Sequence, residues 1–156
     1  MSGALLPLVL VDVLVVVVTS VAVGAAAPRW PDAWLGHDTF PLARLPWESV
    51  ERYRRWGVAA LARRLPELGA LFGGSSKSQL PGTSPGELTA YLREVRRAEW
   101  VHWWSIAWSF VLFLFNPIGL AVAFVAAVTL GNLPFILILR NNRFRLQRIL
   151  DRSDTP

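Results

Sequence analysis

The sequence predicts an all-α integral membrane protein with three transmembrane helices, an N-terminal span and a C-terminal helical hairpin, together with one interfacial amphipathic helix. Of its 156 residues, 53% are hydrophobic, more than an ordinary soluble domain contains. Residues 4–27 carry a single charge, Asp12, and residues 104–139 carry none. The 16 lysines and arginines all lie outside these two stretches. This segregation of charge predicts spans in a bilayer.

Residues 1–27 form the predicted first transmembrane helix. Each of its many leucines and valines favours insertion by roughly 0.3 to 0.6 kcal/mol, and together they outweigh the roughly 3 kcal/mol cost of a central Asp12. The alternative is a cleaved signal peptide, since Gly24 to Ala27 resembles a cleavage site. The missing basic n-region, the long apolar run and Pro28 argue against cleavage.

The positive-inside rule places residues 28–100 and 140–156 on the cytoplasmic face of the membrane. The N-terminus is then outside, the C-terminus cytoplasmic, and residues 104–139 form a multi-pass hairpin that breaks at Asn116-Pro117. The interface is marked by tryptophans, namely Trp100, Trp103, Trp104 and Trp108. The alternative is two spans, with residues 104–115 re-entrant.

Residues 28–84 read as a cytoplasmic or interfacial segment. The prolines of residues 28–46 predict extended or turning backbone on the bilayer surface. Residues 48–64 alternate apolar residues with arginines, the pattern of an interfacial amphipathic helix. The loop from Gly73 to Lys77 is either a phosphate cradle containing Lys77 or a flexible linker.

The third region, residues 85–150, is predicted to carry a long helix over about 85–115 and the returning span, and residues 151–156 are a tail. Ser84 and Glu87 form a capping box, with Pro85 at the first helical position. One stripe of the long helix contains Glu99 and His102 three residues apart. A carboxylate beside an imidazole fixes its tautomer and raises its basicity, as a general base requires.

Reflection of the hairpin about Asn116-Pro117 brings Asn132 level with His102 and Arg140 level with Glu94. The predicted cluster has Glu99, His102 and Asn132 inside, while its rim consists of Glu94, Arg97, Arg140, Asn142 and Arg143. Pro134 should loosen the returning helix there.

The polar cluster also has a simpler interpretation. Glu94 with Arg97 and Glu99 with Arg96 would then be surface ion pairs of small value, and His102 would sit at the headgroup level. Two further polar sites stay open: Asp12 inside its span, and His37-Asp38 in the proline-rich segment.

The absence of cysteine excludes disulfides, thiolate nucleophiles and cysteine metal sites, and no metal site or cofactor is predicted. The net charge of +5 is explained by arginines that set topology and contact anionic lipid. No nucleic-acid-binding motif is present, so nucleic acid is not an expected partner.

These residues resemble the glycosyl-4,4'-diaponeurosporenoate acyltransferase family of carotenoid biosynthesis, over roughly residues 29–150. The resemblance lies in the order and spacing of several motifs, namely Trp30-Pro31-Asp32, Arg64-Leu65-Pro66, Gly73-Gly74 through Lys77, Glu94 to Glu99, His102-Trp103, Asn116-Pro117, Asn132 to Pro134 and Leu139 to Leu146. The chain departs from the family pattern at Val95, Leu139, Asn141 and Phe144.

The resemblance implies a membrane O-acyltransferase (EC 2.3.1.-) of the bacterial cell membrane. It would esterify a sugar hydroxyl of a glycosylated carotenoid or related glycolipid with a fatty acyl group. His102, oriented by Glu99, would be the base, and Asn132 or the Gly73–Lys77 loop would stabilise the oxyanion. Acyl-CoA or acyl carrier protein would be the donor, bound by a set of polar residues consisting of Lys77, Glu94, Arg97, Arg140, Asn142 and Arg143. The expected partners are membrane lipid, the acyl donor and the glycosylated lipid acceptor.

The alternative from a different class is a non-catalytic membrane subunit. Its arginines would bind a soluble partner or anionic lipid, and the polar cluster would only clamp the helices together.

Overall fold

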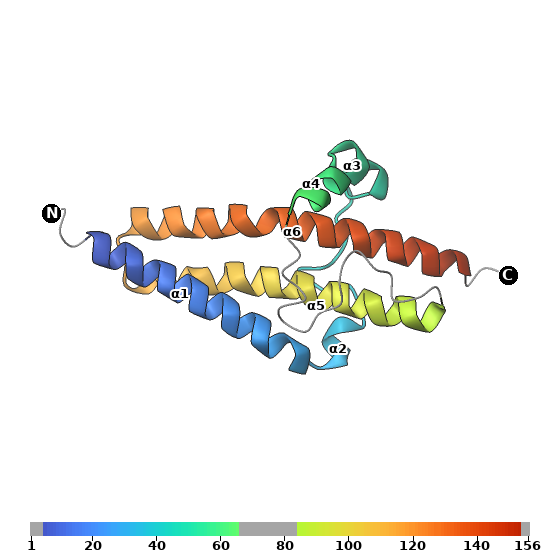
Figure 1. Cartoon of the computed structure of the whole chain (residues 1–156), viewed down its shortest axis with the longest axis horizontal. Helices are drawn as coiled ribbons and strands as arrows, with labels where there is room; N and C mark the ends of the chain where they lie inside the picture. The colour runs from blue at the N-terminus through green and yellow to red at the C-terminus, as the bar shows by residue number, and fades with distance from the viewer. Residues whose placement is uncertain (1–4, 66–83, 154–156) are drawn as a thin grey trace.

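The computed structural model describes residues 5–65 and 84–153, which are helical and contain no strand. Three long helices run lengthwise through the molecule: α1 (Leu5–Ala26), α5 (Pro85–Ser109) and α6 (Ile118–Ser153) (Figure 1). The remaining elements are short, namely η1 (Ala27–Arg29), α2 (Asp32–Leu35), α3 (Val50–Arg55), α4 (Val58–Arg64) and η3 (Phe110–Leu114). The predicted all-α class is confirmed.

Two helices in the described part of the chain are long and apolar enough to cross a membrane. One is α1 continued by η1, over Leu5–Arg29, and the other is α6. The 22 residues of α1 extend about 33 Å at 1.5 Å per residue, which matches the roughly 30 Å hydrocarbon core. The predicted third span, residues 104–115, is not one of these two helices. Its residues form the end of α5 and the 3-10 helix η3, and the earlier part of α5 carries many charges.

The start of α5 is the predicted one. The Ser84 side chain accepts a hydrogen bond from the Glu87 backbone N–H, and the Glu87 carboxylate accepts from the Ser84 backbone N–H at 3.2 Å. This reciprocal capping satisfies donors that a helix otherwise leaves without partners. The end of α5 differs from the prediction of regular helix to residue 115, since its last turns tighten into the 3-10 helix η3 before the chain reverses at Asn116-Pro117.

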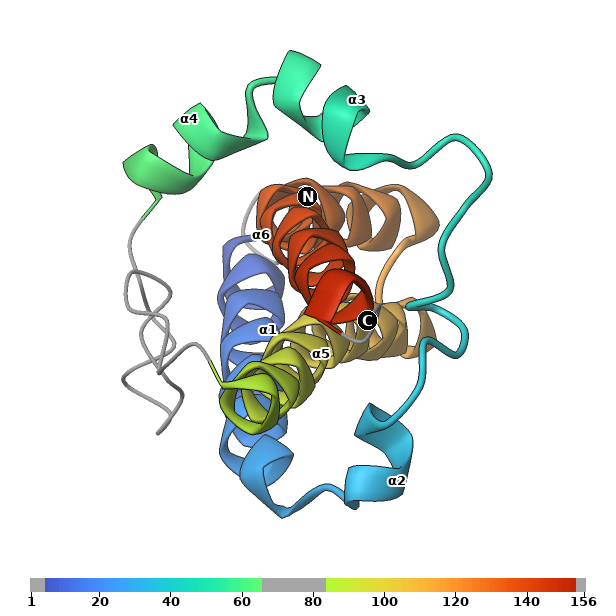
Figure 2. The ribbon, with the colours of Figure 1, turned by 90° about the vertical axis from the view of Figure 1, so that its right-hand side faces the viewer.

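The predicted single amphipathic helix over residues 48–64 is wrong in one respect: it is two helices. Ser49 caps α3 by accepting a hydrogen bond from the Arg52 N–H, and Gly57 then adopts a φ of +71°. Only glycine takes this left-handed backbone without steric cost. The chain therefore turns at Gly57, and α3 and α4 meet at an angle on the outer side of α6 (Figure 2).

Two further predictions concern the backbone of residues 28–46 and the effect of Pro134 on α6. Residues 28–46 are mostly turns, as expected, but they also contain the short helices η1 and α2. The helix α6 continues without a break through Pro134, which donates no backbone hydrogen bond there.

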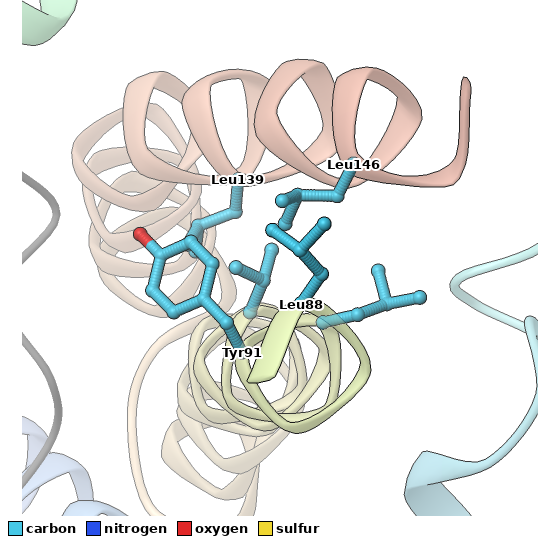
Figure 3. Close-up of a cluster of buried hydrophobic side chains, with 6 residues drawn as sticks. Leu88, Tyr91, Leu139 and Leu146 are labelled. Carbon is cyan, nitrogen blue, oxygen red and sulfur yellow. The ribbon is translucent and has the colours of Figure 1, made fainter. Parts of the chain in front are cut away.

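An apolar core joins α5 to α6. Four residues on α5 (Leu88, Tyr91, Leu92 and Val95) pack against Leu139 and Leu146 of α6 (Figure 3). This core confirms that the predicted stripe of α5 faces the returning helix. A second cluster, formed by Tyr53, Val58, Ile138 and Phe144, attaches α3 and α4 to α6.

Asp12 is fully buried and ties α1 to the hairpin turn. Its carboxylate accepts a hydrogen bond of 2.7 Å from the Asn116 side-chain amide, which also donates to the Leu112 carbonyl at 3.1 Å. The N-terminal part of α1 and the α5–α6 turn therefore lie at the same end of the molecule (Figure 1).

Candidate functional site

The predicted meeting of His102 and Asn132 is present. The Nδ1 atom of His102 on α5 lies 2.7 Å from Oδ1 of Asn132 on α6. The amide nitrogen of Asn132 donates to the Val128 carbonyl at 2.8 Å, which fixes the amide orientation. Since an oxygen faces Nδ1, the proton of the neutral ring belongs on Nδ1 and the lone pair on Nε2. The geometry thus selects one tautomer.

The plane of the His102 ring is also set. It stacks on Phe135 with a centroid separation of 5.0 Å and an interplanar angle of 7°. Phe135 and Asn132 are three residues apart on α6, so they share one face of that helix. One helix therefore supplies both the hydrogen bond and the packing surface that orient the imidazole. His102 itself is half-buried.

Glu99, one turn before His102, is fully buried between two arginines of α6. Its Oε1 accepts from Nε of Arg140 at 2.7 Å, and its Oε2 accepts from Nε of Arg143 at 3.1 Å. The sequence assigned Glu99 the role of orienting His102. In the structure, both oxygens of this carboxylate accept hydrogen bonds from the arginines, and the contact of His102 Nδ1 is with the side-chain oxygen of Asn132.

Arg140 and Arg143 are 4% and 0% exposed, so the prediction that they lie at an open rim is wrong. Every guanidinium nitrogen of both residues is bonded within the protein. For Arg140, Nη1 donates to the Glu48 carboxylate at 2.6 and 2.8 Å, and Nη2 donates to the Pro41 carbonyl. The physical reason is that residues 38–48 cover the arginines and pair with them.

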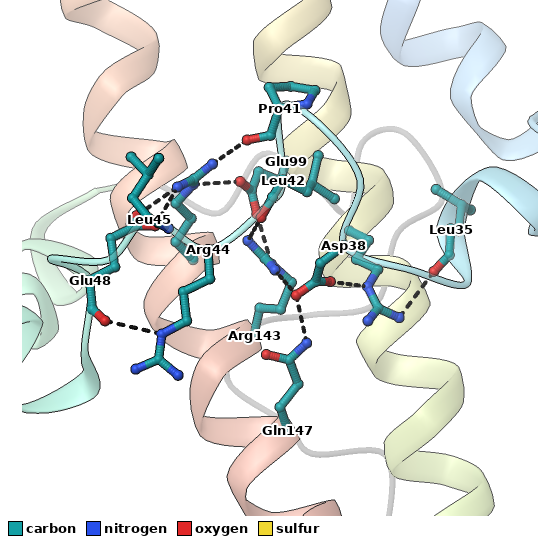
Figure 4. Close-up of polar contacts among 12 residues, drawn as sticks. Leu35, Asp38, Pro41, Leu42, Arg44, Leu45, Glu48, Glu99, Arg143 and Gln147 are labelled. Atoms are coloured by element: carbon teal, nitrogen blue, oxygen red, sulfur yellow. Dashed lines mark hydrogen bonds and ion pairs between the residues drawn. The ribbon is translucent and has the colours of Figure 1, made fainter.

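Two acids that the sequence analysis did not place in the cluster complete this network (Figure 4). Asp38 accepts from Arg96 at 2.8 Å, from Gln147 at 2.8 Å and from Arg143. Glu48 pairs with Arg140 and accepts from the Leu45 N–H at 2.7 Å. The buried network, hereafter the ion network, consists of Asp38, Glu48, Glu99, Arg96, Arg140 and Arg143.

The charges of the ion network balance, with three carboxylates against three guanidinium groups. They alternate along one path: Arg96, Asp38, Arg143, Glu99, Arg140 and Glu48. A buried charge is tolerated when it is paired and hydrogen-bonded in this way. The ion network therefore fastens the segment between α2 and α3 to α5 and α6.

The two acids of the ion network that lie outside the long helices, Asp38 and Glu48, have lowered pKa values. Burial alone would raise the pKa of Asp38, but the hydrogen bond from Gln147 and the charges of Arg143 and Arg96 outweigh it, so the pKa lies below 3.8. Burial opposes ionisation of Glu48 too, yet hydrogen bonds from Tyr53, Leu45 and Arg140 keep its pKa below 4.5. Both acids are ionised at neutral pH.

The remaining predicted site residues have different surroundings. Arg97 pairs with Glu94 on its own helix, and its Nη2 lies 4.0 Å from Asp32. Glu94 therefore does not meet Arg140 as the hairpin reflection suggested. Asn142 is half-buried on α6. Lys77 and the Gly73–Lys77 loop lie outside the described residues.

An apolar cleft of about 470 Å³ lies between α1 and α5. Four tryptophans line it together with small residues of α1, the full set being Thr19, Ala22, Val23, Ala26, Trp30, Trp34, Trp104 and Trp108. On α5, Trp104 is rotated about 200° from His102, at 100° per residue. The cleft and the His102–Asn132 pair therefore lie on opposite faces of α5.

These features define a helical protein of membrane type, in which a histidine–amide pair lies beside a buried ion network. The chain belongs to the glycosyl-4,4'-diaponeurosporenoate acyltransferase family, whose sequence model matches residues 32–152. The match includes His102, Asn132 and the whole ion network, and it begins after α1. The family name specifies an acyltransferase of carotenoid biosynthesis. No curated protein and no solved structure matches the chain.

Proposed function

We propose that this protein is a membrane O-acyltransferase that esterifies a sugar hydroxyl of a glycosylated carotenoid or related glycolipid with a fatty acyl group. The family match supports the reaction class. The observation that carries the mechanism is the 2.7 Å contact between His102 Nδ1 and Asn132 Oδ1.

His102 is the general base. With Nδ1–H donated to Asn132, Nε2 accepts the proton of the sugar hydroxyl as its oxygen attacks the acyl carbonyl carbon. The tetrahedral intermediate collapses when the carbon–sulfur bond of the thioester breaks. The departing thiolate takes the proton back from Nε2, which returns the ring to its starting tautomer.

Asn132 is a positioning residue in this mechanism. Its Oδ1 lies against Nδ1 of His102, and its Nδ2 donates one N–H to the Val128 carbonyl, so both ends of the amide are held. We therefore assign Asn132 the role of orienting the base. We assign Glu99, Arg140 and Arg143 to the ion network, which fixes α5 against α6 one turn from His102.

The proposed topology has three crossings, with α5 and η3 as the middle one. Two facts support it: the contact of Asp12 with Asn116 puts the start of α1 and the hairpin turn at one end, and the arginines gather toward the other. The His102–Asn132 pair then lies near the cytoplasmic boundary of the bilayer, where acyl-CoA and acyl carrier protein are available. The arginine-free apolar part of α6 extends only to Leu139.

The experiment is acyl transfer by the purified protein in lipid nanodiscs. Radiolabelled acyl-CoA and glycosyl-4,4'-diaponeurosporenoate are supplied, and the ester product is identified by chromatography and mass spectrometry. Product that requires the protein is expected. A folded protein that yields no ester with acyl-CoA or with acyl carrier protein, on carotenoid and non-carotenoid glycolipids alike, would contradict the proposal.

A further inference from the structure

The outward surface of α3 and α4 is strongly basic. Its five arginines are all exposed, and we call them the basic face: Arg52, Arg54, Arg55, Arg63 and Arg64. The one acid in these two helices, Glu51, is paired with Arg148 of α6 at 2.8 Å. Within residues 5–65 and 84–153, none of the five arginines has a carboxylate within 4.0 Å.

The opposite surface of α3 and α4 is already occupied. Tyr53 and Val58 are 1% and 2% exposed because they pack against Ile138 and Phe144 of α6. This packing fixes the rotation of both helices about their axes. α3 and α4 lie on the outer side of α6 (Figure 2), and the exposed arginines of the basic face lie on the surface that this packing leaves open.

The helices α3 and α4 contact α6 where its uncharged part ends and its arginine-rich part begins. Residues 118–139 of α6 carry no charge, and arginines begin at Arg140. Ile138 and Phe144 lie on either side of this change, so α3 and α4 are held at the level where α6 would leave the hydrocarbon. Trp47 and Trp56 lie beside the basic face. Their ring centroids are 5.8 Å apart, and the two residues are 44% and 52% exposed.

We propose that the basic face binds the anionic lipid headgroups of the leaflet that it faces. Arginines supply the electrostatic attraction, and the exposed indoles of Trp47 and Trp56 enter the interface, where tryptophan prefers to lie. An acidic carrier protein would use the same charges, but two exposed tryptophans at the membrane level favour lipid. The proposal rests on the membrane insertion of α1 and α6 and is independent of catalysis.

Lipid bound at this surface would be connected to the candidate site. Glu48, directly before the Ser49 cap of α3, holds Arg140 in the ion network. Arg140 in turn holds Glu99, one turn from His102. The basic face and the candidate site are thus joined through Glu48 and Arg140.

The test measures how deeply α4 sits in a bilayer. The chain contains no cysteine, so Ala60→Cys gives a single labelling site on the exposed side of α4. The full-length protein carries a fluorophore there, in nanodiscs of phosphatidylcholine with or without 30% phosphatidylglycerol, and with a headgroup-attached quencher. We expect at least about twofold stronger quenching with phosphatidylglycerol, and loss of this difference in Arg54→Glu/Arg63→Glu.

The matched control is Arg145→Glu/Arg152→Glu, which makes the same charge change at exposed positions of α6. It should keep the response to phosphatidylglycerol. Equal quenching in both lipids, or equal loss in both double variants, overturns the proposal. An unchanged label signal combined with a selective loss of transfer from acyl carrier protein, but not from acyl-CoA, overturns it in favour of a protein partner. A protein without acyltransferase activity would still give the lipid response.

Discussion

The Glu99 carboxylate on α5 lies 2.7 Å from Nε of Arg140 on α6, and the two side chains are 0% and 5% exposed. This contact joins the two long helices at one level and is extended by Arg143, Glu48 and Asp38. The segment between α2 and α3 is thereby held on the helical hairpin by charge pairs instead of by an apolar core of its own.

Removal of the Glu99 charge should strongly destabilise the fold. Glu99→Gln leaves Arg140 and Arg143 buried with one carboxylate fewer, and breaking a buried pair typically costs about 3–5 kcal/mol. The free energy of unfolding in mixed micelles measures the change. Glu51→Gln, which removes an exposed pair, is the control and should have little effect. Equal stability of Glu99→Gln and the wild type would contradict the role of the ion network.

The stabilisation that the ion network gives to the folded state should be lost at acidic pH. Asp38 and Glu48 have lower pKa values in the folded than in the unfolded chain, so the folded state binds fewer protons. Their stabilisation is complete above the unfolded values of 3.8 and 4.5, and it is lost as the pH falls through the lower folded values. Hydrogen–deuterium exchange of residues 38–48, measured at each pH and corrected for the intrinsic exchange rate at that pH, reports release of the segment. Release that begins above pH 6 would contradict this assignment.

The sequence predicted the features that depend on local spacing. The capping box at Ser84 and the reversal at Asn116-Pro117 are read from adjacent residues, and the reversal then sets which residues of α5 and α6 are level. His102 and Asn132 were paired correctly because they lie close to the turn, where an error in register is small.

The contacts that the sequence did not predict join residues far apart in the chain. Asp38 meets Arg143 across 105 residues of chain, and Glu48 meets Arg140 across 92. Asp38 lies in the proline-rich segment, which has no periodicity, and Glu48 lies at the first residue of the predicted amphipathic helix. Neither position indicates the face that the acid approaches. Glu94 was placed opposite Arg140 by extrapolating the hairpin further from the turn, whereas its partner is Arg97.

Gly57 should be required for the angle between α3 and α4. At a φ of +71°, Gly57→Ala forces an alanine into the left-handed region, at a cost of about 1–2 kcal/mol. Gly86→Ala lies within the first turn of α5, where a Cβ meets nothing within 4 Å, and it should not destabilise the protein. Thermal unfolding in the same micelles compares the two. A similar response of both variants would contradict the backbone argument.

The three-crossing topology predicts which sites face which side of the membrane. In the cysteine-free chain, Gly119→Cys lies beside the hairpin turn, where a Cβ has open space, and Ser153→Cys lies at the far end of α6. In intact cells an impermeant maleimide should label the cysteine at position 119 but not the one at 153. After the cells are permeabilised, both should react. Labelling of both sites in intact cells, or of neither, would contradict the topology.

The central claim is that His102, oriented by Asn132, is the base of acyl transfer. The most direct measurement is kcat for ester formation by His102→Ala, with His37→Ala as the matched control, because His37 is the other histidine and is exposed. We expect a loss of about 10²–10⁴-fold for His102→Ala and none for His37→Ala. Asn132→Leu should lower kcat and shift its pH profile, while Asn132→Asp keeps an acceptor for Nδ1–H and should retain more activity. Wild-type kcat in a folded His102→Ala protein would contradict the account.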